Sequence, residues 1–127
     1  MPAHPRGIAP ILTMTDVHAA AELYEKAFGF QRVRYFDGNE EYLVLERESA
    51  QLHLAQMGAA SPNHAHGAHV ADVFCWVDDL TPVLASAARA GLVTQRGPEH
   101  YDTTPVATME VVFEDPDGYW FCFATAD

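Results

Sequence analysis

The chain has seven histidines, and three of them lie close together: His64, His66 and His69. Imidazole is the commonest protein ligand for transition metals, and the H-x-H-x-x-H spacing lets a flexible tract fold around nickel, copper or zinc. The same stretch contains proline, asparagine and glycine, which is the composition of a polar linker. Short motifs of this kind often match by chance, so we favour the linker over a dedicated metal site.

A second candidate for chemistry is Asp72, which interrupts the apolar run of residues 70–77. A buried carboxylate is costly unless it is paired or faces a wet cavity, so Asp72 is the strongest single site residue in the sequence. Side chains alternate along a strand, which puts Phe74 and Trp76 on the face of Asp72. Aromatic rings there can stack on a planar ligand or attract a cation, although large aromatic residues in strands also fill cores.

Two further strand-like runs carry candidate contacts. Near the C-terminus, alternation puts Trp120 and Ala124 on the same face as Cys122. Earlier in the chain, it puts His53 on the face of Gln51. His53 lies between two leucines, so it is either a ligand contact, a general base or a core histidine with its hydrogen bonds satisfied.

Composition narrows the classes of partner. The 127 residues fit one domain, and 49% hydrophobic residues are enough for a core. A formal net charge of −11 disfavours nucleic acid and would attract a cationic small molecule, although plain solubility explains it as well. The apolar runs are too short to span a bilayer and no targeting segment is evident, so we expect a cytoplasmic protein. Cys75 and Cys122 lie in apolar runs and are expected to be reduced.

An internal duplication organises the chain. ILTMTDVHAAAELYEKAFGF and DVFCWVDDLTPVLASAARAGL both predict a strand, an acidic cap, an amphipathic helix and a terminal glycine. Asp16 and Asp79 are 63 positions apart (79 − 16), and Gly29 and Gly91 are 62 apart (91 − 29). Strand signals follow each helix, at 32–36, 41–46 and 51–55 and again at 92–95, 108–113 and 119–124.

The segments between these elements are predicted to be turns or loops. Residues 37–40 (DGNE) and 115–118 (DPDG) have the composition of tight turns. Residues 96–107 (RGPEHYDTTPVA) contain two prolines and mixed polarity, so we predict a long loop there. Tyr101 and His100 in this loop are placed to close over a ligand, with Glu99 and Asp102 available to meet positive charge.

Three segments together resemble a known family: ILTMTDVHAAAELYEKAFGF, VDDLTPVLASAARAG and VVFEDPDGYWFCF. They resemble the vicinal oxygen chelate superfamily of glyoxalases, bleomycin-resistance proteins and extradiol dioxygenases, over about residues 7–125. The resemblance implies an α+β fold of two tandem βαβββ modules whose curled mixed sheets enclose a cavity, often completed in a homodimer. A single domain at 1–127 would then comprise module one (about 7–57), a linker (58–68) and module two (about 69–125).

Members of this superfamily that bind a catalytic metal offer a His in the first strand of each module and a Glu in the last. Counting back from the ends of the first strands, Met14 and Val77, and forward from DPDG, the corresponding positions are Ala9, Gln51, Asp72 and Cys122. A shifted register in the first module would bring in His53 instead of Gln51. Alanine has no donor atom and glutamine is a weak ligand, so we predict no catalytic metal and no cofactor.

The resemblance also implies a use of the cavity without metal, because bleomycin-resistance proteins sequester their drug in an acidic, aromatic-lined crevice between two subunits. We therefore predict a homodimeric protein that binds a planar, aromatic or cationic antibiotic, with neither nucleic acid nor membrane as partner. The predicted contacts are Gln51, His53, Asp72, Phe74, Trp76, Tyr101, Trp120 and Cys122. The alternatives are a glyoxalase- or dioxygenase-like enzyme with an atypical metal site, or a metal-free isomerase with Asp72 or His53 as general base.

Overall fold

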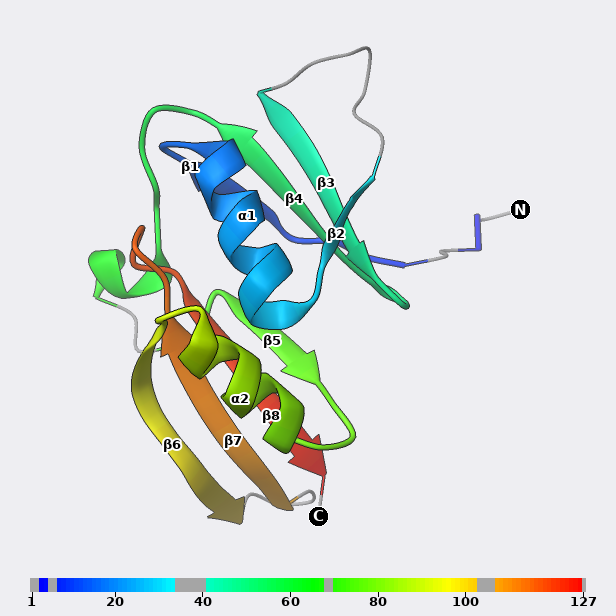
Figure 1. The fold of residues 1–127 in the computed structure, drawn as a ribbon, viewed down its shortest axis with the longest axis vertical. Helices are drawn as coiled ribbons and strands as arrows, with labels where there is room; N and C mark the ends of the chain where they lie inside the picture. The colour runs from blue at the N-terminus through cyan, green and yellow to red at the C-terminus, as the bar shows by residue number, and fades with distance from the viewer. Residues whose placement is uncertain (1–2, 5–6, 34–40, 68–69, 103–106, 127) are drawn as a thin grey trace.

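The computed structural model describes residues 3–4, 7–33, 41–67, 70–102 and 107–126, and its elements repeat in the predicted order (Figure 1). The first module comprises β1 (Ile11–Met14), α1 (Val17–Phe28), β2 (Gln31–Val33), β3 (Tyr42–Arg47) and β4 (Ala50–Gln56). The second comprises β5 (Val73–Trp76), α2 (Thr81–Arg89), β6 (Val93–Asp102), β7 (Ala107–Glu114) and β8 (Trp120–Ala126). A short 3₁₀ helix, η2 (Asn63–His66), lies in the linker.

Each module folds into a four-stranded mixed sheet. The strand order is β1-β4-β3-β2 in the first sheet and β5-β8-β7-β6 in the second. Strand β1 runs parallel to β4 and β5 parallel to β8, while the other neighbours are antiparallel. The described strands form two separate sheets and no closed barrel. This architecture confirms the predicted α+β fold of two tandem βαβββ modules.

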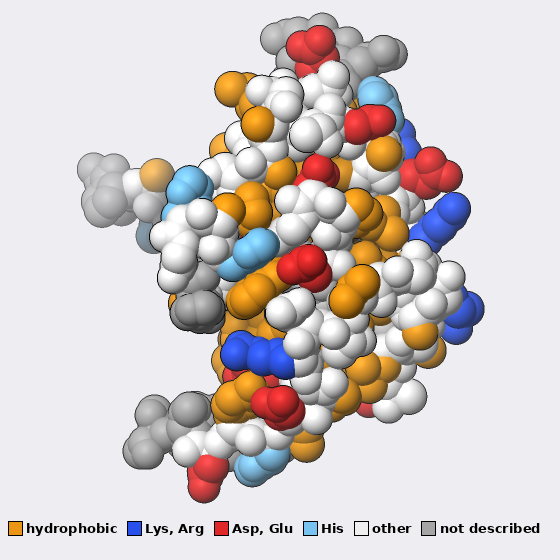
Figure 2. Space-filling model, turned by 90° about the vertical axis from the view of Figure 1, so that its left-hand side faces the viewer, with side chains coloured by type: hydrophobic (Ala, Val, Ile, Leu, Met, Phe, Trp, Pro, Cys, Tyr) orange, Lys and Arg blue, Asp and Glu red, His pale blue; other side chains and the backbone are white. Residues whose placement is uncertain are grey.

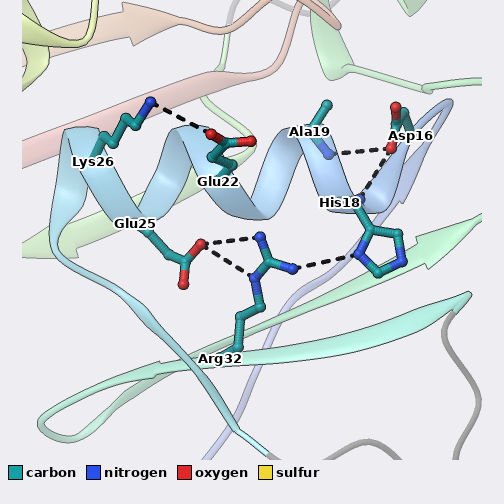
Figure 3. A network of polar contacts seen from close by, with 7 residues as sticks. All are labelled: Asp16, His18, Ala19, Glu22, Glu25, Lys26 and Arg32. Atoms are coloured by element: carbon teal, nitrogen blue, oxygen red, sulfur yellow. Dashed lines mark hydrogen bonds and ion pairs between the residues drawn. The ribbon is translucent and has the colours of Figure 1, made fainter.

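Helix α1 begins and ends where the sequence predicts. The Asp16 carboxylate accepts hydrogen bonds from the backbone N–H groups of His18 and Ala19, both at 3.1 Å, and so caps the N-terminus (Figure 3). Gly29 ends the helix with a φ of 76°, a left-handed conformation that glycine adopts at little cost. The buried face consists of the predicted stripe, Val17, Ala20, Ala21, Tyr24, Ala27 and Phe28.

Two ion pairs lie on the outer side of α1 (Figure 3). Glu22 and Lys26 form the predicted pair, with 3.5 Å between Oε1 and Nζ. Arg32 of β2 reaches Glu25 at 3.1 Å and so ties that strand to the helix. Ion pairs near the surface contribute about 0–1 kcal/mol, so the buried stripe rather than these charges stabilises the helix.

Helix α2 follows the same plan with a different cap. The Asp79 carboxylate accepts a hydrogen bond from the Thr81 backbone N–H at 2.9 Å, and Pro82 lies in the first turn, where a missing N–H costs little. Gly91 follows the helix with a φ of 78°, as predicted for a glycine stop. Neither α1 nor α2 has the length and apolar character that a membrane crossing requires, and the same holds for every other described helix.

Both helices cover the same side of the two sheets and share one apolar core (Figure 1). Phe28, at the end of α1, is 1% exposed, and its ring lies 5.0 Å from that of Phe121 and 4.8 Å from that of Phe123. Burying one large apolar side chain contributes roughly 1.5–3 kcal/mol. The first module is therefore joined to the second by buried aromatic contacts and not by the linker alone.

Buried polar groups also join the two modules. The Tyr24 hydroxyl of α1 donates a hydrogen bond to Asp115, in the predicted DPDG turn, and Asp115 accepts a second one from the Tyr119 backbone N–H at 2.8 Å. The Tyr119 hydroxyl in turn donates to the Thr13 carbonyl at 2.5 Å and accepts from the Ser61 N–H at 3.0 Å. The turn before β8 is thus anchored to β1, to α1 and to the linker.

The prediction of a loop at 96–107 is wrong for most of the segment, which is a strand as far as Asp102. Strand β6 runs as far as Asp102 and pairs with β7, with Tyr101 opposite Thr108. Register shifts on both sides of Arg96 mark an irregularity, and Gly97 beside it has a φ of 83°. A bulge of this kind lets a strand accommodate a proline and then resume its pairing, which composition alone does not reveal. Residues 103–106 and the predicted turn at 37–40 lie outside the described residues.

We expect Gly97→Ala to lower the free energy of unfolding by about 2 kcal/mol or more. An added Cβ would lie 2.4 Å from the backbone oxygen of Glu110, and the left-handed φ is unfavourable for alanine. Gly91→Ala is the matched control, because it has a similar φ but open space around the added Cβ, and should lose about 1 kcal/mol. Equal losses for the two variants in urea denaturation would contradict the steric part of this prediction.

Candidate functional site

Each sheet has one face covered by the helices and one turned away from them, here called the open face. On the second sheet, Phe74 lies opposite Cys122, and Trp76 lies opposite Ala124, which confirms the predicted alternation. Phe74 is 50% exposed and Trp76 is 57% exposed, and their rings meet edge to face with centroids 5.1 Å apart. These two aromatic residues therefore do not fill the core.

Trp120 lies on the same open face and is held from two sides. Its indole Nε1–H donates to Glu114 at 2.7 Å, and the His64 imidazole stacks on its ring with 4.9 Å between centroids and 11° between planes. His64 is fixed in turn by a 2.7 Å hydrogen bond from Nε2 to the Gly118 carbonyl. A side chain restrained in this way is a pre-organised surface for stacking.

The histidines of the linker have partners within the fold. His64 stacks on Trp120, and the Nε2 atom of His66 lies 2.8 Å from the Ser61 hydroxyl. The two imidazoles therefore contact different elements and do not converge on one point. His69, the third histidine of the motif, lies outside the described residues.

Cys122 lies on the floor below these aromatic rings and is 2% exposed. Its Sγ donates to Glu110 at 3.5 Å, and Glu110 also accepts a hydrogen bond from the Thr108 hydroxyl at 2.8 Å. Burial, together with the negative charge of Glu110, raises the pKa of Cys122 to about 12. Burial also raises the pKa of Cys75, and both cysteines are free thiols, as predicted. A raised pKa lowers the thiolate fraction of each cysteine at neutral pH and so lowers its reactivity.

We expect native Cys122 to react with iodoacetamide at pH 8 roughly a thousandfold more slowly than the same thiol in the unfolded chain, because the thiolate reacts and the thiol does not. The rate for the folded protein should keep rising until the pH approaches the pKa of about 12. Mass spectrometry of the peptides that carry Cys75 and Cys122 separates the two reactions. A native rate that levels off near pH 9 would contradict the assignment.

Asp72 has structural partners at both carboxylate oxygens. One accepts a hydrogen bond from the Asn63 backbone N–H and the other from the Trp120 backbone N–H, both at 2.8 Å. These bonds connect η2 and the start of β8 to the residue that precedes β5. They are sufficient to explain why a carboxylate is tolerated in this apolar run, and no bound ligand is needed for that explanation. The arrangement does not favour Asp72 as a general base, because both of its oxygens already accept hydrogen bonds.

His53 is the centre of a polar chain on the open face of the first sheet. Its Nδ1 lies 2.7 Å from the Tyr42 hydroxyl and its Nε2 lies 3.4 Å from Oε1 of Gln51. Because Oε1 can only accept, we assign the proton to Nε2, so that Nδ1 of the neutral ring accepts from Tyr42. Tyr42 was not among the predicted contacts, since only strand pairing brings it beside His53.

The duplication places His53, and not Gln51, at the position equivalent to Cys122. Ile11 and Phe74 are related by the offset of the helix caps, 63 positions (74 − 11). Ile11 lies opposite His53 in β4, and Phe74 lies opposite Cys122 in β8. The residue of the first module that is equivalent to Cys122 is therefore His53, two residues after the predicted Gln51. The four family positions become Ala9, His53, Asp72 and Cys122.

These four positions do not fit the catalytic metal of the family. Ala9 has no donor atom, the Asp72 oxygens accept backbone N–H groups, and the Cys122 thiol is protonated and hydrogen-bonded to Glu110. Within the described residues, no group of three or more His, Cys, Asp or Glu side chains is arranged to hold a metal ion. The donor set therefore supports no metal-dependent step.

Two adjoining hollows lie along the N-terminal segment, and Ile8, Ala9 and Gln51 line both. The apolar hollow has a volume of about 340 Å³ and is walled mainly by Phe30, Phe74, Phe121 and Phe123. The polar hollow has a volume of about 540 Å³ and is lined also by Glu46, Glu48, Ser49 and His53. Figure 2 shows that hydrophobic side chains reach the surface between acidic and histidine side chains on the face in view.

Tyr101 lies at the opposite edge of the second sheet from Phe74 and Trp76. It belongs to β6, which β7 and β8 separate from β5. Its hydroxyl donates to Glu99 at 2.7 Å, and the Arg96 guanidinium lies 5.5 Å from the centre of its ring. These partners hold Tyr101 within β6, so the structure does not support the expectation that it lies on a closing loop.

Comparison with known proteins agrees with this architecture. Residues 7–123 match the family model of the Glyoxalase/Bleomycin resistance protein/Dioxygenase superfamily, whereas no curated protein matches the sequence. An integron cassette protein from the mobile metagenome of V. cholerae is 23% identical, with a TM-score of 0.71 and 98% of each chain covered.

Two further solved structures share the fold. A glyoxalase/bleomycin resistance protein/dioxygenase from Alicyclobacillus acidocaldarius is 12% identical, with a TM-score of 0.75 over 94% of this chain and 90% of that one. TnmS3, described as an antibiotic binding protein from Streptomyces sp. CB03234, is 17% identical, with a TM-score of 0.69 and 100% of both chains covered. The family match over residues 7–123 and the two βαβββ modules together show that the chain belongs to the glyoxalase/bleomycin resistance protein/dioxygenase superfamily.

Proposed function

We propose that the protein binds an aromatic small molecule, of the antibiotic type, on the open faces of its sheets and sequesters it without a metal. The observation that carries this proposal is the pair of exposed rings, Phe74 and Trp76, at 50% and 57% exposure on one edge strand. Large apolar side chains that stay exposed side by side mark a binding surface, because burying them would otherwise stabilise the fold. The description of TnmS3 as an antibiotic binding protein supports the same choice.

The predicted contacts divide into three groups under this proposal. Phe74, Trp76 and Trp120 form the aromatic surface, with Cys122 as its floor. Gln51 and His53 supply hydrogen bonds from the polar hollow. Asp72 borders the apolar hollow and acts mainly by holding Trp120 in place. Tyr101 lies on β6, near the Glu110 carboxylate that accepts a hydrogen bond from Cys122.

We also propose a homodimer in which a second copy covers part of the open faces. Ile8 and Ile11 are 94% and 60% exposed at the edge formed by β1, and the aromatic pair lies at the edge formed by β5. Apolar residues on two unpaired strand edges favour association. Analytical ultracentrifugation tests this point, and a sedimentation coefficient of a monomer at all concentrations would contradict it.

Intrinsic fluorescence tests the binding proposal, because the two tryptophans of the chain, Trp76 and Trp120, both belong to the proposed aromatic surface. Titration with a panel of planar aromatic and cationic glycopeptide antibiotics should give a saturable change for at least one compound, which is then recovered unchanged. Trp76→Ala should weaken its binding roughly thirtyfold, as expected for a central aromatic contact.

The control for this titration is Val93→Ala, which removes an equally exposed apolar side chain from β6 and should leave binding unchanged. If no compound of the panel binds, the proposal fails. If the bound compound is converted into a product, an isomerase or lyase becomes the better assignment.

A further inference from the structure

We propose that His64 is a positioning residue for Trp120, and that it holds the indole more firmly when its imidazole gains a proton. The aromatic surface then binds its ligand more tightly at mildly acidic pH than at alkaline pH. This inference rests on the proposed function and adds its regulation. It follows from the contacts of His64 with Trp120, Gly118 and Glu114, here called the His64 clamp.

The neutral imidazole of His64 already has a defined orientation. Its plane lies 11° from that of the Trp120 indole, and its Nε2 lies 2.7 Å from the Gly118 carbonyl oxygen. Because a carbonyl oxygen can only accept, we assign the proton of the neutral ring to Nε2, which leaves Nδ1 to take up a second proton. The ring fits closely, since a Cβ added at Gly118 would lie 3.2 Å from Nε2. Protonation at Nδ1 therefore adds charge to the ring while the hydrogen bond from Nε2 is kept.

One oxygen of Glu114 contacts both members of the stack. Its Oε1 accepts a hydrogen bond from the Trp120 indole Nε1–H at 2.7 Å and lies 4.0 Å from Nε2 of His64. The His64 and Glu114 side chains are 33% and 32% exposed, so salt screens their attraction less than that of a fully exposed pair. An imidazolium at this position is attracted both by the carboxylate and by the face of the indole ring. The neutral ring carries no net charge to take part in either attraction, so protonation strengthens the His64 clamp.

The backbone on both sides of the stack is held by a single carboxylate. Asp72 accepts one hydrogen bond from the backbone N–H of Asn63, the residue before His64, and another from the backbone N–H of Trp120. The two stacked residues are therefore joined through their backbones as well as through their rings. Trp120 is half-buried, so part of its ring remains accessible to a ligand. A side chain held in place before binding loses less conformational entropy when the ligand arrives.

The other titratable groups around His64 are bonded to other partners. Asp72 accepts backbone N–H groups at both oxygens, and Asp117, in the turn before β8, accepts a hydrogen bond at 2.9 Å from a threonine hydroxyl that precedes α1. The Nε2 atom of His66 lies 2.8 Å from a serine hydroxyl. Among the described residues, Glu114 is therefore the charged side chain that responds directly to a proton on His64.

Fluorescence tests the His64 clamp directly, because Trp76→Phe leaves Trp120 as the only tryptophan of the chain. A protonated imidazole in contact with an indole quenches its emission, so the emission should fall as the pH is lowered from about 8 to about 5, the range in which histidine gains its proton. His64→Gln retains an amide that can donate to the Gly118 carbonyl but does not titrate, and it should abolish the fall. His66→Gln removes the other histidine of η2, which does not contact the indole, and it should retain the fall.

Calorimetry tests the effect on binding, with pyrenemethanol and any antibiotic of the panel that binds as probes. Pyrenemethanol is flat and uncharged, so a pH dependence of its affinity belongs to the protein. We expect it to bind roughly threefold more tightly near pH 5.5 than near pH 8, as for one modest cation–π contact. By linkage, binding near pH 6.5 should then take up protons in the native protein and none in His64→Gln, which a comparison of two buffers with different ionisation enthalpies measures. Glu114→Gln keeps an acceptor for the Trp120 Nε1–H without the charge, and it should reduce the gain in affinity.

The outcomes separate this inference from the proposed function. Emission that stays constant between about pH 5 and 8, or that falls equally in His64→Gln, overturns the His64 clamp. Equal affinity and no proton uptake with a probe that does bind overturn the regulation and leave antibiotic binding untouched. If nothing binds at all, the proposed function fails, whereas the emission of Trp120 still decides on the clamp. His64→Phe is a second variant that keeps a flat ring without a titrating nitrogen, and circular dichroism at both pH values verifies that each variant is folded.

Discussion

Replacing Phe28 with alanine is expected to lower the free energy of unfolding by about 3–5 kcal/mol, the usual cost of deleting a fully buried aromatic ring. Phe28 is 1% exposed at the end of α1. Its ring packs against those of Tyr24, Phe113, Phe121 and Phe123. Three of these four belong to the second module, so the cavity would open between the modules. Urea denaturation followed by circular dichroism measures the loss.

Phe74→Ala is the matched control, because it deletes the same atoms from a side chain that is 50% exposed on the open face. It should change the free energy of unfolding by less than about 1 kcal/mol while weakening ligand binding. The native protein should also unfold in one cooperative transition, as expected for one domain with a shared core. Two separate transitions, or equal losses for Phe28→Ala and Phe74→Ala, would contradict the shared core.

Replacing Asp115 with alanine should cost about 3 kcal/mol or more, because two buried donors lose their acceptor. Asp115 is 5% exposed and accepts hydrogen bonds from the Tyr24 hydroxyl and from the Tyr119 backbone N–H. These bonds connect the turn before β8 to α1. Removing them should weaken the contact between the modules as well as the turn, and thermal or urea denaturation measures the effect. Asp78→Ala, at an exposed position, is the control and should change stability by less than about 0.5 kcal/mol.

The pH dependence of stability provides a second test of Asp115. Burial raises the pKa of this carboxyl, although the hydrogen bonds from Tyr24 and Tyr119 partly offset the effect. A raised pKa in the folded state means that stabilisation is complete below the unfolded value near 3.8 and is lost as the pH rises through the folded value. The amide introduced by Asp115→Asn does not titrate, so the stability advantage of the native protein over this variant should shrink over that range. An advantage that grows with pH would contradict the assignment.

The features that the sequence predicted correctly are local ones. The cap at Asp16, the glycine stops and the apolar stripe of α1 all depend on residues within one helix, and each is present. The internal duplication allowed the order of strands and helix in one module to be predicted for the other, since the same order recurs at an offset of 63 positions (79 − 16). Alternation along β5 then placed Phe74 and Trp76 on one face.

The features that the sequence did not reveal depend on pairing between distant strands. Tyr42 and His53 meet because β3 and β4 are neighbours, and nothing in the residues around Tyr42 signals that contact. The choice between Gln51 and His53 required the register of β4 against β1, and a register error moves a position by one or two residues. Asp72 was correctly singled out as unusual, but its partners, Asn63 and Trp120, lie 9 and 48 positions away.

Composition misled the prediction for residues 96–107 for a physical reason. Proline, glycine and charged residues usually signal a loop, and this segment contains all of them. Because the irregularity beside Gly97 accommodates Pro98, β6 continues to Asp102 along β7. A strand at the edge of a sheet tolerates such residues, since only one of its sides is paired.

The alternation of side chains along β5 and β8 has a consequence for how such a protein can diversify. Phe121 and Phe123 point into the core, while Phe74, Trp76 and Trp120 face the other way. Substitutions on the outward positions can therefore alter which compound is retained while the inward positions continue to keep the chain folded. A descendant of this chain could acquire a new guest molecule through a few such replacements without needing compensating changes in its interior.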